Sequence, residues 1–292
     1  MELTTNSPVR SLGVYHTDTA TSELSKAFSM GESVVPSSVY ERLLERSKIE
    51  SVPVIESHES DNTLIAWPCL RANDCRGVVV FECESGDELR GAFEVWRRND
   101  RGELGLSEGW YANLQRLEQV SKYIKFPRRA GLPGKTWDDR FPRVLGRLTE
   151  SKDFIRVAAA RSDRLSSAIS IPFMQRPPEL DAVTLVLSAS SSPFARAIEV
   201  WAKDPEGEGL RIVSADYGQL VDLAPISRPM TLSVGDGIAG RVFDGAEPWM
   251  THDLMGAEYQ RGNLFVEYGL AVGLGIPVFI GSELVACVNL YL

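Results

Sequence analysis

Cysteine and histidine are scarce in this sequence, with four and three copies among 292 residues. Three cysteines lie between residues 69 and 83 and Cys287 stands alone, which does not make a disulfide framework, so we expect a reducing compartment. Strand alternation predicts that Cys69 and Cys83 face each other across one hairpin as reduced thiols. The three histidines lie in separate segments without metal-ligand spacing. We therefore expect no metal and no cofactor.

A targeting segment is also missing from the pattern. The N-terminus lacks a basic run followed by an apolar core, so no signal peptide is expected. Residues 270–292 carry a single charge, Glu283, and on hydropathy alone are long enough to span a bilayer. Pro277 and three nearby glycines argue against one continuous helix. These features predict a cytoplasmic protein without a membrane span.

Catalytic motifs and an excess of positive charge are lacking too. Thirty-one Lys and Arg against forty Asp and Glu give a net charge of −9, which disfavours nucleic acid and anionic membranes as partners. No Gly-x-Ser-x-Gly elbow and no recognisable pair of catalytic carboxylates occurs. With 43% hydrophobic and 24% charged residues the chain is typical of a globular protein, and we expect it not to be an enzyme.

One basic stretch opposes the acidic balance. Eight cationic residues surround the expected helix start at Gly131, where free backbone amides favour anions. A solvated basic face, an anion site and, given the interleaved Tyr123 and Phe126, a nucleic-acid contact all remain open here. The eight residues are Lys122, Lys125, Arg128, Arg129, Lys135, Arg140, Arg143 and Arg147.

The chain contains an internal repeat with an offset of 105 or 106 residues. The segment 92–96 (AFEVW) recurs at 197–201 (AIEVW), and 131–137 (GLPGKTW) recurs at 237–243 (GIAGRVF). An apolar hairpin around Pro68 precedes its counterpart at Pro172 by 104 residues. We therefore divide the chain into residues 1–86, a degenerate copy or an N-terminal extension, and two units of one domain, 87–190 and 191–292. We call these the N-terminal segment, the central unit and the C-terminal unit.

Each unit shows the same order of expected elements. Two strands joined by a polar turn come first, then a helix starting at Gly131 or Gly237, a second helix, and two more strands. This order predicts an α+β fold with an antiparallel sheet and helices packed on one or both of its faces. Only nine residues separate Leu187 from Ala197, too few for a long connecting helix, so the two units should touch.

The ordered motifs of residues 88–292 resemble GAF domains, a six-stranded sensory fold. The resemblance is carried by the Gly-[Leu/Ile]-x-Gly-[Lys/Arg]-x-[Trp/Phe] helix starts, by the prolines at 142 and 248, by the Phe/Tyr-x-Arg pairs at 154 and 259, and by Ile-Pro at 171 and 276. It implies a non-catalytic module for signal transduction. The sequence departs from the family by lacking the long helices that usually begin and end such a domain.

The resemblance implies a ligand pocket between each sheet and the helices that cover it. A small ligand, for which an anion is one candidate, or a signalling protein would bind there, and a pocket above ~300 Å³ in either unit would favour this function. The same aromatic residues also fit a plain core, so an assembly module with filled cores, acting through other proteins or as a homo-oligomer, is the alternative. An uncharacterised enzyme is the third. The candidate pocket residues are Trp96, Tyr111, Lys135 and Trp137 in the central unit and Trp201, Tyr217, Arg241 and Phe243 in the C-terminal unit.

Overall fold

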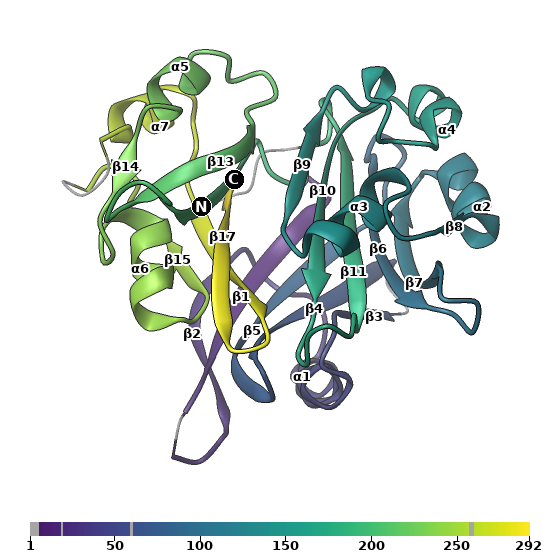
Figure 1. Ribbon diagram of the computed structural model, residues 1–292, viewed down its shortest axis with the longest axis horizontal. Helices are drawn as coiled ribbons and strands as arrows, with labels where there is room; N and C mark the ends of the chain where they lie inside the picture. Colours follow the sequence, from purple (N-terminus) through teal and green to yellow (C-terminus); the bar gives the residue numbers. More distant parts are fainter. Residues whose placement is uncertain (1–5, 19, 59–60, 257–259) are drawn as a thin grey trace.

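The computed structural model describes residues 6–18, 20–58, 61–256 and 260–292, which form three antiparallel sheets (Figure 1). The first sheet has the order β2-β1-β5-β4-β3 and is crossed by one long helix, α1. Its elements are β1 (Val9–Thr17), β2 (Leu24–Met30), α1 (Ser37–Glu50), β3 (Val54–Ser57), β4 (Asn62–Arg71) and β5 (Asp74–Glu84).

The second sheet belongs to the central unit and has the order β8-β7-β6-β11-β10-β9. Its helices include α3 at the expected Gly131 start and α2, which the sequence analysis missed. The elements are β6 (Gly91–Arg98), β7 (Leu104–Ala112), α2 (Gln115–Tyr123), β8 (Lys125–Phe126), α3 (Gly131–Asp139), β9 (Arg143–Gly146), the 3₁₀ turn η1 (Leu148–Glu150), α4 (Val157–Ser162), β10 (Leu165–Phe173) and β11 (Ala182–Ala189).

The third sheet belongs to the C-terminal unit and repeats this plan as β14-β13-β12-β17-β16-β15. The predicted α+β fold with antiparallel sheets is therefore confirmed in both units. The elements are β12 (Ala197–Lys203), β13 (Leu210–Asp216), α5 (Leu223–Ser227), β14 (Thr231–Leu232), α6 (Gly237–Gly245), β15 (Trp249–Thr251), α7 (Gly262–Glu267), β16 (Gly273–Ile280) and β17 (Glu283–Tyr291).

The apolar stretch at residues 270–292 forms the β16–β17 hairpin, whose two strands are interior strands of the third sheet. Its side chains are buried by protein on both faces, which explains a hydropathy that imitates a membrane segment. Across the described ranges, no helix is both long and apolar enough to cross a bilayer.

A proline marks the same place in all three sheets. Pro68, Pro172 and Pro277 each lie two residues beyond the last residue that pairs with the short edge strand, which is Ala66, Ser170 or Gly275. A proline has no N–H to donate, so it fits where the neighbouring strand has already ended. The first sheet thus has the strand order of the other two without their outermost strand, β8 or β14.

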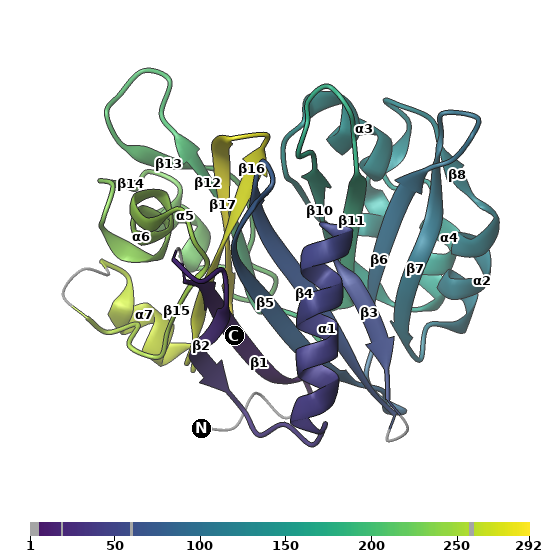
Figure 2. The same ribbon diagram turned by 90° about the horizontal axis from the view of Figure 1, so that it is seen from below.

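The inner faces of the three sheets meet in one shared hydrophobic core, and the helices lie around the outside (Figures 1 and 2). Trp67 of β4 contacts both Phe93 of β6 and Phe173 of β10, with ring centroids 5.6 and 5.7 Å apart. Phe81 of β5 contacts Phe194, just before β12, at 5.1 Å. Because each sheet is covered on both faces, β11 is buried along its whole length instead of alternating.

The cysteine prediction was wrong in its pairing. Cys69 lies opposite Gly77 and Cys83 lies opposite Thr63, because the turn of the β4–β5 hairpin falls at residues 72–73. All four cysteines are free thiols, and burial raises the pKa of Cys69, Cys83 and Cys287 well above the usual value.

Candidate functional site

A buried ion pair lies between the sheet and the helices of the central unit. Glu94 of β6 is fully buried, and Arg156, just before α4, is 3% exposed. The guanidinium donates to both carboxylate oxygens, at 2.5 and 2.8 Å. Trp96 Nε1, Tyr111 OH and Ser121 Oγ complete the carboxylate's partners at 3.1, 2.9 and 2.8 Å. A buried charge pair is tolerated only with such additional hydrogen bonds.

The C-terminal unit repeats this cluster residue for residue. Arg261 donates to Glu199 and to Ser227 Oγ. Trp201 Nε1 and Tyr217 OH each lie 2.8 Å from the Glu199 carboxylate. Burial opposes ionisation, but Arg261 and these donors hold the pKa of Glu199 below its usual value.

Tyr291 of β17 is an addition in the C-terminal cluster. Its hydroxyl lies 3.1 Å from Glu199 and accepts from Arg261 at 3.1 Å. In the central unit the strand pairing places Leu187 at the matching position, opposite Ala92 as Tyr291 is opposite Ala197, and a leucine has no hydroxyl to make such a contact. The C-terminal cluster is therefore the more extensively bonded of the two.

Four of the eight candidate pocket residues belong to these clusters. Trp96 and Trp201 are fully buried, and Tyr111 and Tyr217 direct their hydroxyls to the central carboxylates. Burial raises the pKa of both tyrosines. The structure thus brings each Trp–Tyr pair together around a glutamate whose hydrogen-bonding capacity is satisfied by protein.

The other four candidates lie on α3 and α6. Lys135 forms an ion pair with Asp153 at 2.5 Å. Trp137 lies against the guanidinium groups of Arg98 and Arg128. Arg241 lies over Trp249, with its guanidinium 5.3 Å from the centroid of the ring. Phe243 packs, partly buried, against the core that contains Trp201.

Most of the basic stretch is paired within the chain. Arg128 and Arg129 share Asp138, at 2.7 and 2.8 Å. Arg143, the first residue of β9, pairs with Asp139, the last residue of α3. Lys122 pairs with Glu118 on the same helix, α2, and Arg147, just before η1, pairs with Glu150. Such exposed pairs are each worth about 0–1 kcal/mol, and their geometry is that of a solvated, charge-balanced face.

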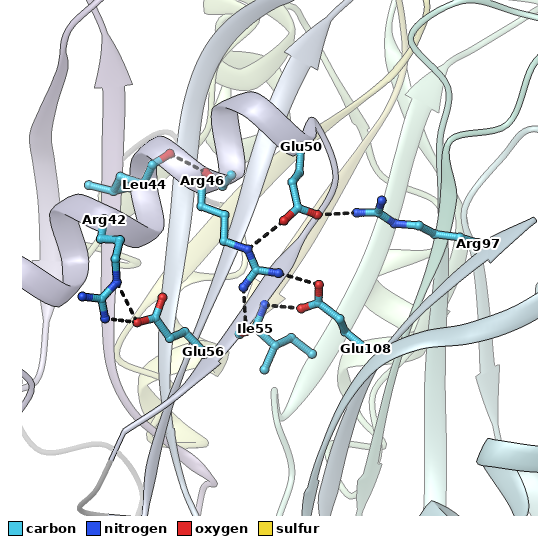
Figure 3. Close-up of polar contacts among 9 residues, drawn as sticks. Arg42, Leu44, Arg46, Glu50, Ile55, Glu56, Arg97 and Glu108 are labelled. Atoms are coloured by element: carbon cyan, nitrogen blue, oxygen red, sulfur yellow. Dashed lines mark hydrogen bonds and ion pairs between the residues drawn. The ribbon is translucent and has the colours of Figure 1, made fainter.

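A second ionic network fastens the N-terminal segment to the central unit (Figure 3). Arg46 of α1 donates to Glu50 at 2.7 Å and to Glu108 of β7 at 2.6 Å. Glu108 also accepts from the backbone N–H of Ile55 at 2.9 Å, so it caps the open edge of β3. Arg97 of β6 reaches Glu50 at 2.6 Å. This network holds two sheets at a fixed distance.

A cavity open to solvent lies between the central and C-terminal units, with about 440 Å³ of empty space when its solvent-filled mouth is included. Arg196, before β12, and Asp216, at the end of β13, carry opposite charges on its wall. Asp216 accepts from the Gly218 N–H at 3.2 Å, and burial raises the pKa of its carboxyl. The lining residues are Ser166, Ser167, Ala189, Ser190, Pro193, Ala195, Arg196, Asp216, Gly218, Gln219 and Leu220.

Two other cavities are less suited to a specific ligand. One lies where Pro68, Pro172 and Pro277 converge, and ten of its twelve lining residues are apolar. The other, about 670 Å³, is an open groove between β9 and β13 whose charged members, Asp139 and Arg143, are already paired. Within the described ranges, no group of three His, Cys, Asp or Glu residues is placed to hold a metal ion.

Sequence reasoning missed Arg196 and Asp216, although a signal was present. In the repeat they stand where the central unit has Gly91 and Trp110, so both charges appear only in the C-terminal copy. Finding the cavity itself required the arrangement of the units, which the repeat does not give.

A scan against protein-family models finds no match for this chain, and a search of curated proteins also finds none. Solved structures do match. The chain is similar to the GAF domain/HD domain protein from Geobacter sulfurreducens, with 12% identity over 35% of this chain and 65% of that one and a TM-score of 0.28. It is also similar to Staphylococcus aureus NreA mutated in its nitrate-binding site, with 11% identity, 33% and 73% coverage and a TM-score of 0.28.

A third similar structure is the GAF domain of a two-component sensor histidine kinase from Bacillus halodurans, with 10% identity, 54% and 78% coverage and a TM-score of 0.25. In the chain itself, two six-stranded antiparallel sheets follow one plan, with matched helix starts at Gly131 and Gly237. The fold of this protein is GAF-like.

Proposed function

We propose that this protein is a non-catalytic binding module that takes up a small ligand at the junction between its central and C-terminal units. The observation that carries the proposal is the cavity whose wall holds Arg196 and Asp216. Ligand sites are typically concave and hold a few polar groups in fixed positions. This cavity is concave and places two opposite charges beside Pro193, Ala195 and Leu220.

The filled layers beneath the helices support this location. In both units the space where the family resemblance implies a ligand contains an Arg–Glu pair, a tryptophan and a tyrosine. A ligand at Trp96, Tyr111, Lys135 and Trp137, or at Trp201, Tyr217, Arg241 and Phe243, would have to displace these contacts. That location remains the competing site for the same function, and a small anion its expected ligand.

We further propose that residues 1–86 form a third unit that serves as a scaffold. Its sheet has the strand order of the other two without one outer strand, and its proline stands at the matching position. The network of Arg46, Glu50 and Glu108 would then fix this unit against the central one.

A second candidate function is an assembly module without a ligand. It is favoured by the shared core, because the inner face of each sheet is buried against the other sheets of the same chain. The outer helices would then contact a signalling protein or a second copy of the chain.

A thermal-shift screen with nucleotides, organic acids, sugars, amino acids and nitrate separates these functions. A ligand at a hundred times its dissociation constant stabilises the folded state by ~2.7 kcal/mol, which for a chain of this size raises Tm by about 5–10 °C. Ser190 and Ser191 are the central residues of one exposed turn, and only Ser190 lines the cavity.

We expect Ser190→Trp to abolish the shift and Ser191→Trp to leave it intact. A ligand-induced rise in Tm that persists in Ser190→Trp would indicate that the ligand binds between the sheet and the helices of a unit instead. No shift with any compound would favour the assembly module.

A further inference from the structure

Arg196 and Asp216 lie at the same end of the β12–β13 hairpin. Asp216 pairs with Ile198, and Arg196 lies two residues before Ile198, one residue outside β12. Both residues line the same cavity, so the two charges are diagonal neighbours at the end of the hairpin. Diagonal neighbours have their Cβ atoms up to 7–8 Å apart, which leaves room for a small molecule between two polar ends.

The Asp216 carboxylate retains most of its accepting capacity. Its hydrogen bond from Gly218 uses one of about four lone-pair sites. Gly146, at the end of β9, closes over it so tightly that a Cβ there would lie 2.9 Å from Oδ1. The carboxylate is thus placed at the junction by both units.

The Arg196 guanidinium also has donors to spare. Nη1 donates to the Gly269 carbonyl at 3.2 Å, which leaves four of its five N–H groups. Arg196 and Asp216 form no ion pair with each other or with any other side chain among the residues that the structure describes. Opposite charges that share a cavity without neutralising each other are complementary to a ligand that carries both charges.

The rest of the cavity wall limits what such a ligand can carry. Ser166, Ser167 and Ser190 contribute hydroxyl groups, and Pro193, Ala195 and Leu220 contribute apolar surface. This combination suits a short aliphatic or hydroxylated side chain, while the Asp216 carboxylate disfavours a phosphate.

We infer that the junction cavity binds a small zwitterion of the α-amino-acid class, with Asp216 accepting from its ammonium group and Arg196 donating to its carboxylate. The inference rests on the proposed function, because it takes this cavity as the ligand site. The central unit has no equivalent site. There the matching positions are Gly91 and Trp110, which pack together, with a Cβ at Gly91 lying 3.6 Å from the indole ring.

The test uses glycine, L-alanine, L-serine, L-valine and L-leucine as probes of the full chain, read by thermal shift and by calorimetric titration. At least one should raise Tm by several degrees. Its N-acetyl derivative, which lacks the ammonium group, and its methyl ester, which lacks the carboxylate, should each bind at least tenfold more weakly. Equal binding of a derivative and its parent would overturn the inference.

Variants locate the effect. Asp216→Asn and Arg196→Gln should each weaken binding at least tenfold, whereas Asp204→Asn, on the far turn of the same hairpin, should leave it unchanged. Binding that survives both cavity variants would contradict the site. If all five probes fail while another compound class binds and Ser190→Trp abolishes its binding, the zwitterion inference falls and the junction site stands. If no compound binds, the proposed function falls as well.

Discussion

The central and C-terminal units share an interior but not a surface. Both bury an arginine against a glutamate, with a serine, a tyrosine and a tryptophan as partners. Residues 87–190 nevertheless contain 18 Lys and Arg against 14 Asp and Glu, whereas residues 191–292 contain 6 against 13. The repeated residues are therefore those that form the interior of each unit. The residues that differ between the two copies lie mainly on the surface, where each unit contacts solvent or another unit.

The largest difference that mutation can expose lies in the buried ion pairs. Arg261→Met and Arg156→Met would each leave a glutamate charge buried without its partner, at a cost of ~3–5 kcal/mol. Arg261→Met should cost more, because Arg261 also donates to Tyr291. Urea unfolding measures both costs.

The exposed Arg228→Met is the control, with an expected change within about 0.5 kcal/mol. A loss below 1 kcal/mol for both buried variants would mean that the clusters contribute little to stability.

The matched helix starts give the next largest effect. A Cβ at Gly134 would lie 2.2 Å from the Pro127 carbonyl oxygen, and one at Gly240 would lie 2.5 Å from that of Ser233. Gly134→Val and Gly240→Val should therefore each lower the free energy of unfolding by ~1–3 kcal/mol. Gly245→Val meets only the flexible Glu247 side chain and should be milder. If Gly134→Val and Gly240→Val were both as stable as the parent chain, the alignment of the two helix starts would be contradicted.

The features that repeat in both units were predicted from the sequence, but the contacts between distant residues were not. Matched motifs located the helix starts and the proline-bearing strands in both units, since these depend on local backbone geometry. Glu94 and Glu199 each lie inside an apolar run, and the repeat aligns Arg156 with Arg261. No local pattern indicates that each glutamate pairs with the arginine 62 residues further along the chain.

The shared core was beyond prediction for a similar reason. The unbroken apolar run of β4 indicates a strand buried on both faces, but not that Phe93 and Phe173 of another unit cover it. The charged helix α2 was missed because its short amphipathic segment carries only Leu117 and Ser121 as buried residues.

The pH dependence of two carboxyl groups should run in opposite directions. The pKa of Asp216 is raised by burial, so its ionisation costs stability at neutral pH, and Asp216→Asn should raise Tm at pH 7 but not at pH 3. The pKa of Glu199 is lowered against the effect of burial, chiefly by Arg261. The contribution of Glu199 is therefore present at pH 7 and is lost as the pH falls below about 4. Thermal melts of Asp216→Asn and Glu199→Gln from pH 3 to 7 check both signs, and parallel curves would contradict them.

The smallest effect concerns the basic face of the central unit. Because Arg128, Arg129, Lys135 and Arg143 already have carboxylate partners, phosphate and chloride at matched ionic strength should change Tm alike, through screening over ~8–10 Å. A phosphate-specific rise in Tm that Lys135→Glu with Arg143→Glu removes, and that Arg241→Glu leaves intact, would instead establish an anion site at α3.

The central claim is that the units form one body around a shared core, and scanning calorimetry of Arg156→Met and Arg261→Met tests it most directly. Independent domains unfold in separate transitions, whereas elements that share a core unfold together. We predict a single transition for the parent chain, moved to lower temperature by either variant, because Phe93, Ile198 and Phe81 lie in one cluster. Two transitions, of which Arg156→Met moves only one and Arg261→Met only the other, would contradict the claim.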